Sequence, residues 1–156
     1  MIEAWKRVLV LAPHTDDGEF GCGGTMARLV ETGAEVRYVA FSIATKSLPR
    51  GFPPDTLAQE VREATSELGI GASELTVHDF EVRTFPERRQ DILELLIALW
   101  EDWQPDAVFQ PSLHDVHQDV PIWASQRYVS RPALAHGDGP IVPYRRWARQ
   151  FLEFDA

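Results

Sequence analysis

Residues 13–24, with the sequence PHTDDGEFGCGG, place metal-binding side chains directly behind an apolar run. His14 and Asp17 offer an imidazole and a carboxylate three residues apart, a pair that suits zinc or another divalent metal. Asp16 stands between them and could take a proton from water, the general-base role in metal-assisted hydrolysis. The competing interpretation is that Asp16 and Asp17 only cap a helix and that His14 is an ordinary loop residue.

A second polar cluster follows another apolar run near the end of the regular pattern. Residues 111–120 read PSLHDVHQDV and begin in the last two residues of the apolar run 107–112. They contain His114 and His117, so this segment could add imidazole groups to those of the first cluster. The two clusters are about 100 residues apart in sequence, and only the fold can bring them together.

The elements that must position these clusters alternate between strand and helix patterns. Pro86 is predicted to open the longest helix, Thr25 is predicted to cap a helix that ends at Gly33, and Thr56 with Gln59 fits a capping box. The predicted strands are 7–13, 35–42, 74–80 and 107–112, and the helices between them are 25–33, 56–69 and 86–103.

This alternation predicts an α/β fold with a mostly parallel, Rossmann-like sheet and helices on both faces. The usual strand order 3-2-1-4 makes the first and fourth strands neighbours, and ligands bind beyond their carboxyl ends. Both polar clusters follow these two strands. The sequence therefore predicts that residues 14–19 and 114–119 face each other across one crevice.

Composition limits the classes of partner. The chain has 156 residues, the size of one domain, and a net charge of −9, which argues against nucleic acid and against an anionic membrane. No apolar run approaches the roughly 20 residues of a membrane span, and the N-terminus lacks a cleavable signal pattern, so we expect a cytoplasmic protein. One cysteine excludes an intrachain disulfide framework.

Together the two clusters resemble the LmbE-like, or PIG-L, superfamily of N-acetylglucosaminyl deacetylases. Its first signature is A-H-P-D-D-E followed by x-x-G-C-G-G-T, and the chain reads P-H-T-D-D-G-E-F-G-C-G-G-T in the same frame, with Gly18 in place of the usual glutamate. Its second signature is H-x-x-H after the fourth strand. The resemblance covers residues 6–119.

The resemblance implies a zinc hydrolase that removes acetyl from an N-acetylated amino sugar or a related small amide. By position, His14 and Asp17 would be metal ligands, with Zn²⁺ or another divalent metal as cofactor. Asp16 would be the general base, and His117 would stabilise the oxyanion or donate a proton.

The chain departs from the second signature at its last residue. The resemblance makes this histidine the third metal ligand, but the chain has Val120, which cannot coordinate a metal. His114 and His136 are the candidate substitutes. Residues 120–156 also depart from the family. We therefore expect a deacetylase core over 1–119 that is truncated after the fourth strand. We expect residues 120–156 to be an atypical tail of other origin, created by a frameshift or a deletion.

Two other classes of function remain open at this point. The chain could be a non-catalytic or truncated relic of the family, or a metal-free α/β module that binds a sugar or a nucleotide. Arg83 and Arg89 are candidates for binding an anionic substrate group. An unfinished sheet edge beyond the fourth strand would invite formation of a homo-oligomer.

Overall fold

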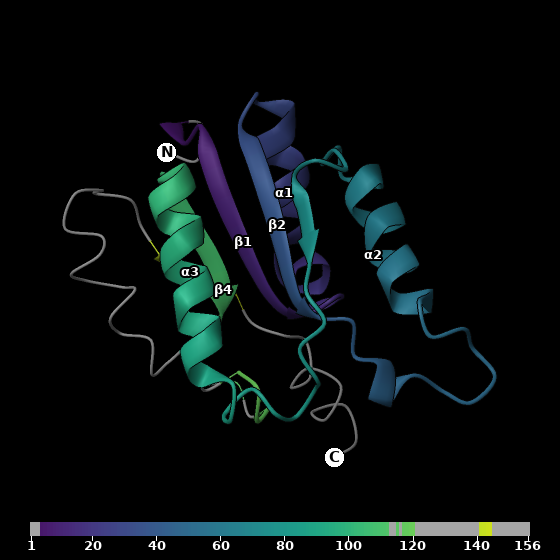
Figure 1. The fold of residues 1–156 in the computed structure, drawn as a ribbon. Helices are drawn as coiled ribbons and strands as arrows, with labels where there is room; N and C mark the ends of the chain where they lie inside the picture. The colour runs from purple at the N-terminus through teal and green to yellow at the C-terminus, as the bar shows by residue number, and fades with distance from the viewer. Residues whose placement is uncertain (1–3, 113–114, 116, 121–140, 145–156) are drawn as a thin grey trace, which may run out of the picture.

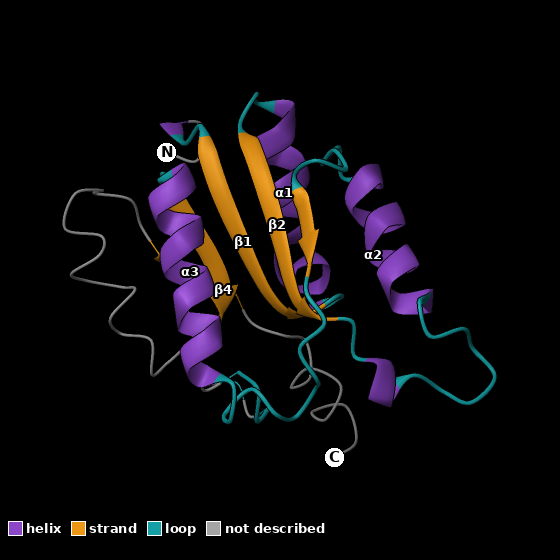
Figure 2. Cartoon of the chain, viewed as in Figure 1, coloured by secondary structure: helices purple, strands orange, loops and turns teal. Residues whose placement is uncertain are grey.

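The computed structural model describes residues 4–112, 115, 117–120 and 141–144. Strands and helices alternate along the chain, and all the strands lie in one sheet (Figures 1 and 2). The elements are β1 (Arg7–His14), α1 (Asp17–Glu31), β2 (Glu35–Ser42), the short 3-10 helix η2 (Thr45–Ser47), α2 (Thr56–Glu67), β3 (Leu75–Val77), α3 (Arg89–Trp103), β4 (Ala107–Pro111) and β5 (Ile141–Tyr144).

The sheet confirms the predicted topology. Its strand order is β3-β2-β1-β4-β5, and every pair of neighbouring strands is parallel. β1 therefore lies between β2 and β4, as the order 3-2-1-4 requires. β5 is an addition that the sequence pattern did not predict, and it pairs with the outer edge of β4. Pro143 lies within β5, an edge position among the described strands, where a missing N–H is tolerated.

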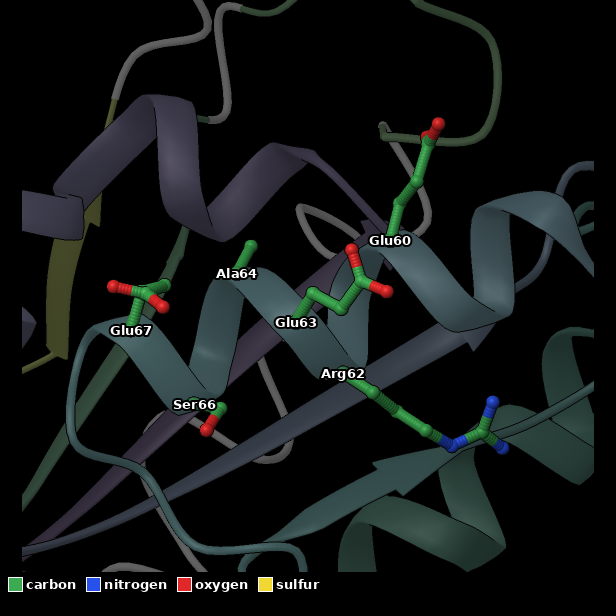
Figure 3. A pocket seen from close by; sticks show the side chains of 6 residues that line it. All are labelled: Glu60, Arg62, Glu63, Ala64, Ser66 and Glu67. Atoms are coloured by element: carbon green, nitrogen blue, oxygen red, sulfur yellow. The ribbon is translucent and has the colours of Figure 1, made fainter.

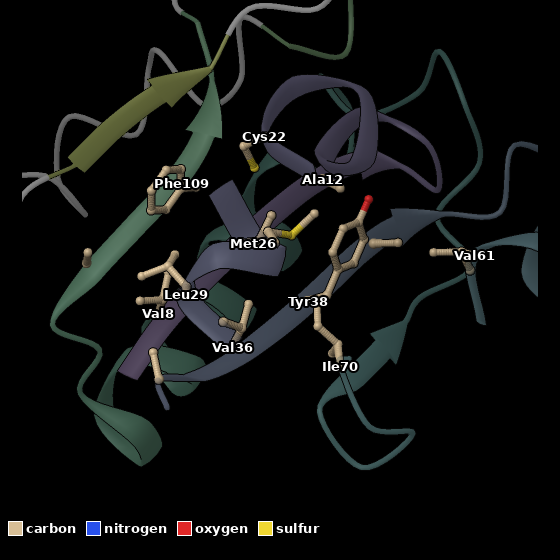
Figure 4. Packing of buried hydrophobic residues seen from close by; sticks show 14 residues of the cluster. Val8, Ala12, Cys22, Met26, Leu29, Val36, Tyr38, Val61, Ile70 and Phe109 are labelled. Atoms are coloured by element: carbon tan, nitrogen blue, oxygen red, sulfur yellow. The ribbon is translucent and has the colours of Figure 1, made fainter. Parts of the chain in front are cut away.

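Alternate residues of β1 point to two separate apolar cores, one on each face of the sheet. Val8 and Val10 pack with Met26 and Leu29 of α1, in the cluster that Figure 4 shows. Leu9 and Leu11 belong to the opposite cluster, to which α3 contributes the buried residues Ile92, Leu96, Trp100 and Trp103. The predicted helix cover on both faces is confirmed, and β1 is held from both sides.

The first helix begins earlier than the sequence predicted. α1 starts at Asp17, and Thr25 lies inside it rather than at its N-cap. The helix is kinked at Cys22, whose φ of −149° and ψ of 22° are not helical. The prediction was wrong because the glycine-rich stretch was interpreted as a turn, whereas it forms a first helical segment before the kink. Asp17 is consequently fixed on a helix.

Three other boundaries also differ from the predictions. The N-cap of α2 is Asp55, and Gln59 donates a side-chain hydrogen bond to it instead of forming a capping box with Thr56. Turns occupy the residues after Pro86, so α3 begins only at Arg89. β3 ends at Val77. None of these differences moves the ends of β1 and β4, which carry the candidate site.

Among the described residues, no helix is both long enough and apolar enough to cross a membrane.

Candidate functional site

His14 is the last residue of β1 and is almost completely buried, with 4% of its surface exposed. Its ring nitrogen Nδ1 lies 3.1 Å from Oδ2 of Asp17, and the same oxygen accepts the backbone N–H of His14 at 2.9 Å. Asp17 is 2% exposed and opens α1. The strand end and the helix start thus fix this imidazole and this carboxylate against each other.

The other ring nitrogen of His14 lies close to a carboxylate that is 105 residues away in sequence. Nε2 of His14 lies 3.0 Å from Oδ2 of Asp119, which has no exposed surface. The backbone N–H of Arg83 donates to the same oxygen at 2.8 Å. Since β1 and β4 are paired, the segments that follow them meet, and the predicted convergence of the two clusters is confirmed.

The two buried carboxylates control the protonation of His14. Burial by itself lowers the pKa of His14, but the hydrogen bonds and negative charges of Asp17 and Asp119 outweigh burial and raise its pKa. Buried charges are costly unless they are compensated, so these contacts favour the protonated imidazole.

His117 lies beside His14, with ring centroids 4.8 Å apart and the rings nearly perpendicular. Nδ1 of His117 accepts the backbone N–H of Asp119 at 3.3 Å. The structure thus brings together one atom each from His14, His117 and Asp119, all within 4.8 Å of one another. Imidazole nitrogens and a carboxylate oxygen are ligands that zinc accepts.

A hollow of about 150 Å³ opens next to this group. His14, Asp16 and His117, three of the residues singled out in the sequence, line it together. The remaining lining residues are Thr15, Ala44, Ser47, Leu57 and Val82. Charged and polar groups therefore meet a partly apolar wall, which is the usual make-up of a small-molecule site.

The other predicted residues are placed as follows. Val120 is 1% exposed and packs in the apolar cluster on the α3 face, so it contributes no ligand. His114 and His136 lie outside the described residues. Arg83 and Arg89 are exposed and do not line the hollow, although the backbone of Arg83 contacts Asp119.

Tyr38 of β2 forms hydrogen bonds with the segment that carries the first cluster. Its hydroxyl donates to the carbonyl oxygen of Thr15 at 3.0 Å and accepts the N–H of Gly18 at 3.1 Å. A Cβ atom at Gly18 would lie 2.6 Å from Cε2 of the Tyr38 ring. The ring therefore occupies the space that a side chain at position 18 would need, which accounts for the glycine at this point of the signature.

Sequence analysis missed Asp119 and Tyr38. The sequence could have suggested Asp119 as a site residue, because it lies between His117 and position 120, where the family has a metal ligand. A histidine in a metal site commonly pairs with a carboxylate. Tyr38 had no signal in the sequence beyond that of an ordinary strand residue. Only the close approach of β2 to the loop after β1 reveals its role.

A larger hollow, of about 660 Å³, runs along the outside of α2 (Figure 3). Its lining residues are Glu60, Arg62, Glu63, Ala64, Ser66 and Glu67, all from one helix. No histidine or buried carboxylate contributes to it, so it lacks the groups that make the hollow beside His14 chemically competent.

The pKa of Glu19 in α1 leads to a testable prediction about the pH dependence of stability. Partial burial, together with the charges of Asp16 and Glu60, raises its pKa from 4.5 to about 7. The folded protein thus holds a proton that the unfolded chain releases above about pH 4.5, so stability falls as pH rises from about 4.5 through about 7. Glu19→Gln is expected to stabilise the metal-free protein by about 1–2 kcal/mol at pH 8 and to have little effect at pH 4.5.

Urea unfolding in chelator at the two pH values measures this difference. Glu63→Gln, on the exposed face of α2, is the matched control and should change little at either pH. An equal effect of Glu19→Gln at pH 4.5 and pH 8 would contradict the assignment.

Solved structures of two deacetylases and a hydratase share this fold. An N,N'-diacetylchitobiose deacetylase from Pyrococcus horikoshii is 21% identical with a TM-score of 0.68, and the similarity covers 92% of this chain and 61% of that protein. The zinc-inhibited form of a teicoplanin deacetylase is 14% identical with a TM-score of 0.69, covering 91% and 68%. A 4-carboxy-2-hydroxymuconate hydratase from Pseudomonas putida KT2440 is 22% identical with a TM-score of 0.63, covering 88% and 62%. The chain thus spans about two thirds of the length of these proteins.

A different similarity is found towards the C-terminus. The sequence model described as the 3-ketosteroid 9α-hydroxylase C-terminal domain matches residues 105–152. A cholesterol 7-desaturase from Caenorhabditis elegans is 47% identical over 34 residues, which are 22% of this chain and 8% of that protein. Both similarities are confined to a small part of the chain.

A further match covers a much longer part of the chain. The sequence model of the PIG-L family, described as GlcNAc-PI de-N-acetylase, matches residues 9–119, from the middle of β1 to Asp119. This range contains both polar clusters and the strands that position them. The chain therefore belongs to the PIG-L family.

Proposed function

We propose that this chain is a metal-dependent hydrolase that removes acetyl from an N-acetylated amino sugar or a related small amide. The observation that carries the proposal is the shared hollow of His14, Asp16 and His117 beside two buried carboxylates. Family membership supports the same type of reaction. Asp17 and Asp119 complete the polar group around His14.

The residues present fit a divalent cation. Asp17 and Asp119 are buried, and each places a carboxylate oxygen beside a ring nitrogen of His14. Among the described residues, Oδ1 of Asp119 has no hydrogen-bond partner. A cation would pair with such buried carboxylates, and the ligand atoms suit zinc. His14 would hold it with Asp17, as the family resemblance implies.

The reaction assigned to the site is hydrolysis of an amide. Bound zinc supplies Lewis-acid chemistry, since it polarises a carbonyl and lowers the pKa of water. Asp16 takes the proton of the attacking water as general base. Nδ1 of His117 accepts a hydrogen bond, so in the neutral ring the proton is on Nε2, which would donate a hydrogen bond to the carbonyl oxygen as negative charge develops on it. The proton that Asp16 takes from water would then pass to the departing amine as the C–N bond breaks.

The size of the hollow limits the part of the substrate that enters it. About 150 Å³ is well below the roughly 300 Å³ at which pockets for whole drug-sized ligands begin. An acetamido group fits this space, while the sugar ring would remain outside. Leu57 and Val82 supply apolar contacts for the acetyl methyl group.

The experiment is to measure release of acetate and free amine from N-acetylglucosamine and N,N'-diacetylchitobiose. We expect release by the zinc-loaded parent, loss of release in chelator, and none from His14→Ala. Release that persists in chelator would contradict metal dependence. Bound zinc without release from any amide would favour the binding-module or relic interpretation instead.

We further propose that residues 120–156 have a different origin from the deacetylase core of residues 1–119. The end of the family match at Asp119 and the second family match over 105–152 support a junction near this point. A frameshift would not preserve a recognisable second sequence, so we favour an in-frame deletion or fusion. Sequencing the locus tests this: a displaced frame encoding a family-like tail would contradict it.

A further inference from the structure

Arg83 has a backbone conformation that residues other than glycine rarely adopt. Its φ is 71°, in the left-handed region, and among the described non-glycine residues only Ala44 and Gln104 also have a positive φ. Gln104 is the C-cap of α3, an ordinary place for this conformation. Arg83 directly follows Val82, which lines the hollow beside His14. Strained backbone at the edge of a candidate site is an observation from which a role in that site can be inferred.

Arg83 occupies the third position of a β-turn formed by residues 81–84. The backbone N–H and the hydroxyl of Thr84 both donate to the carbonyl oxygen of Glu81, at 3.2 and 2.8 Å. Val82, at the second position, is not among the residues with a positive φ, so the turn has the signs of type II. Glycine is the usual residue at the third position of that type. The chain has an arginine there instead, and its side chain is exposed.

The type II conformation determines where the N–H of Arg83 points. Types I and II differ by about a half rotation of the peptide plane between the second and third residues of the turn. That plane carries the carbonyl of Val82 and the N–H of Arg83. In the conformation present, the N–H donates to Oδ2 of Asp119 at 2.8 Å. In a type I turn the carbonyl oxygen of Val82 would face this buried carboxylate instead, and the hydrogen bond would be lost.

The turn and the residue after it contact three parts of the site. The oxygen of Asp119 that accepts from Arg83 also lies 3.0 Å from Nε2 of His14. Phe85 has no exposed surface, and its ring centroid lies 5.9 Å from that of His14. Val82 is 5% exposed and forms part of the wall of the hollow. The position of the imidazole and the shape of the hollow therefore depend on the conformation of this one turn.

We propose that Arg83 is a positioning residue of the proposed active site and that it acts through its main chain. Its left-handed conformation directs the N–H to Asp119, and Asp119 in turn holds the ring of His14. This inference rests on the proposed function and adds a residue to it. It also replaces the earlier expectation that the side chain of Arg83 binds an anionic substrate group, because a main-chain role does not require the guanidinium.

Substitutions at position 83 separate the two roles, with kcat and KM for N-acetylglucosamine measured on folded, zinc-loaded protein. Glycine adopts a positive φ without strain, whereas valine almost never adopts one. Arg83→Val is expected to lower kcat about 10-fold or more relative to Arg83→Gly, with similar KM values. Gln104→Val, the matched control at the end of α3, should lower Tm but keep the kcat of the parent. Equal kcat in Arg83→Gly and Arg83→Val would overturn the inference, and a KM raised in both would assign the guanidinium to substrate binding.

Amide hydrogen exchange tests the contact with Asp119 independently of activity. In the ¹⁵N-labelled chain, the amide of residue 83 should be protected from exchange in the parent and in Arg83→Gly, and this protection should be lost in Arg83→Val. Protection that persists in Arg83→Val, or rapid exchange in the parent, would overturn the inference and leave the proposed function standing. A zinc-loaded parent that hydrolyses no amide would overturn the proposed function, and the inference with it, whatever the exchange result.

Discussion

Replacing Gly18 with glutamate, the residue usual at this position of the family signature, is expected to destabilise this chain by about 2–4 kcal/mol. A Cβ atom at Gly18 would lie 2.6 Å from the Tyr38 ring and 2.9 Å from its hydroxyl oxygen. Tyr38 has no exposed surface and is held by two hydrogen bonds, so it cannot yield easily (Figure 4). The added carboxylate would also be buried.

Thermal unfolding of the metal-free protein measures this effect, with an expected loss of about 5–15 °C in Tm. Gly23→Ala is the matched control in the same helix, because a Cβ there meets nothing within 4 Å. It should be neutral or stabilise by up to about 1 kcal/mol. In a Tyr38→Leu background the cost of Gly18→Ala should shrink. An unchanged cost would show that the ring is not the obstacle.

The second large effect is expected on catalysis. Asp16→Asn should lower kcat by about 10²- to 10⁴-fold, because an amide cannot take the proton that the carboxylate accepts. Asp16 lines the hollow and makes no side-chain cap hydrogen bond to α1, so Asp16→Asn removes no cap from this helix. Zinc content and Tm should therefore remain those of the parent.

Steady-state amine release from N-acetylglucosamine, with zinc measured on the same samples, separates these effects. Asp91→Asn provides the control with the same chemical change at an exposed position. Parent-like kcat in Asp16→Asn would remove Asp16 from the mechanism. Loss of zinc together with kcat would instead assign Asp16 to metal binding.

The sequence was sufficient to predict the features of the fold that depend on repeated apolar patterns. The runs at β1 and β4 and the parallel order of the strands predicted that His14 and His117 would meet, because carboxyl ends of neighbouring parallel strands share one edge. β5 was missed because four residues with a proline give no strand signal of their own. Pairing with β4, a tertiary effect, decides that segment.

The details of the site depended on contacts that no local pattern encodes. The early start of α1 was missed because its glycines favour a turn, whereas the bonds from Tyr38 and Asp17 fix the chain as it enters the helix. Sequence analysis gave Asp119 no role in the site. Its burial against His14 follows from the paths of two distant loops, which the sequence does not reveal.

The most direct test of a metal-dependent site is the amount of zinc bound per chain in protein purified without chelator. We expect about one zinc in the parent and none in His14→Ala, with zinc raising the Tm of the parent only. No zinc in the parent, or equal zinc in His14→Ala, would contradict the metal site and with it the proposed hydrolase.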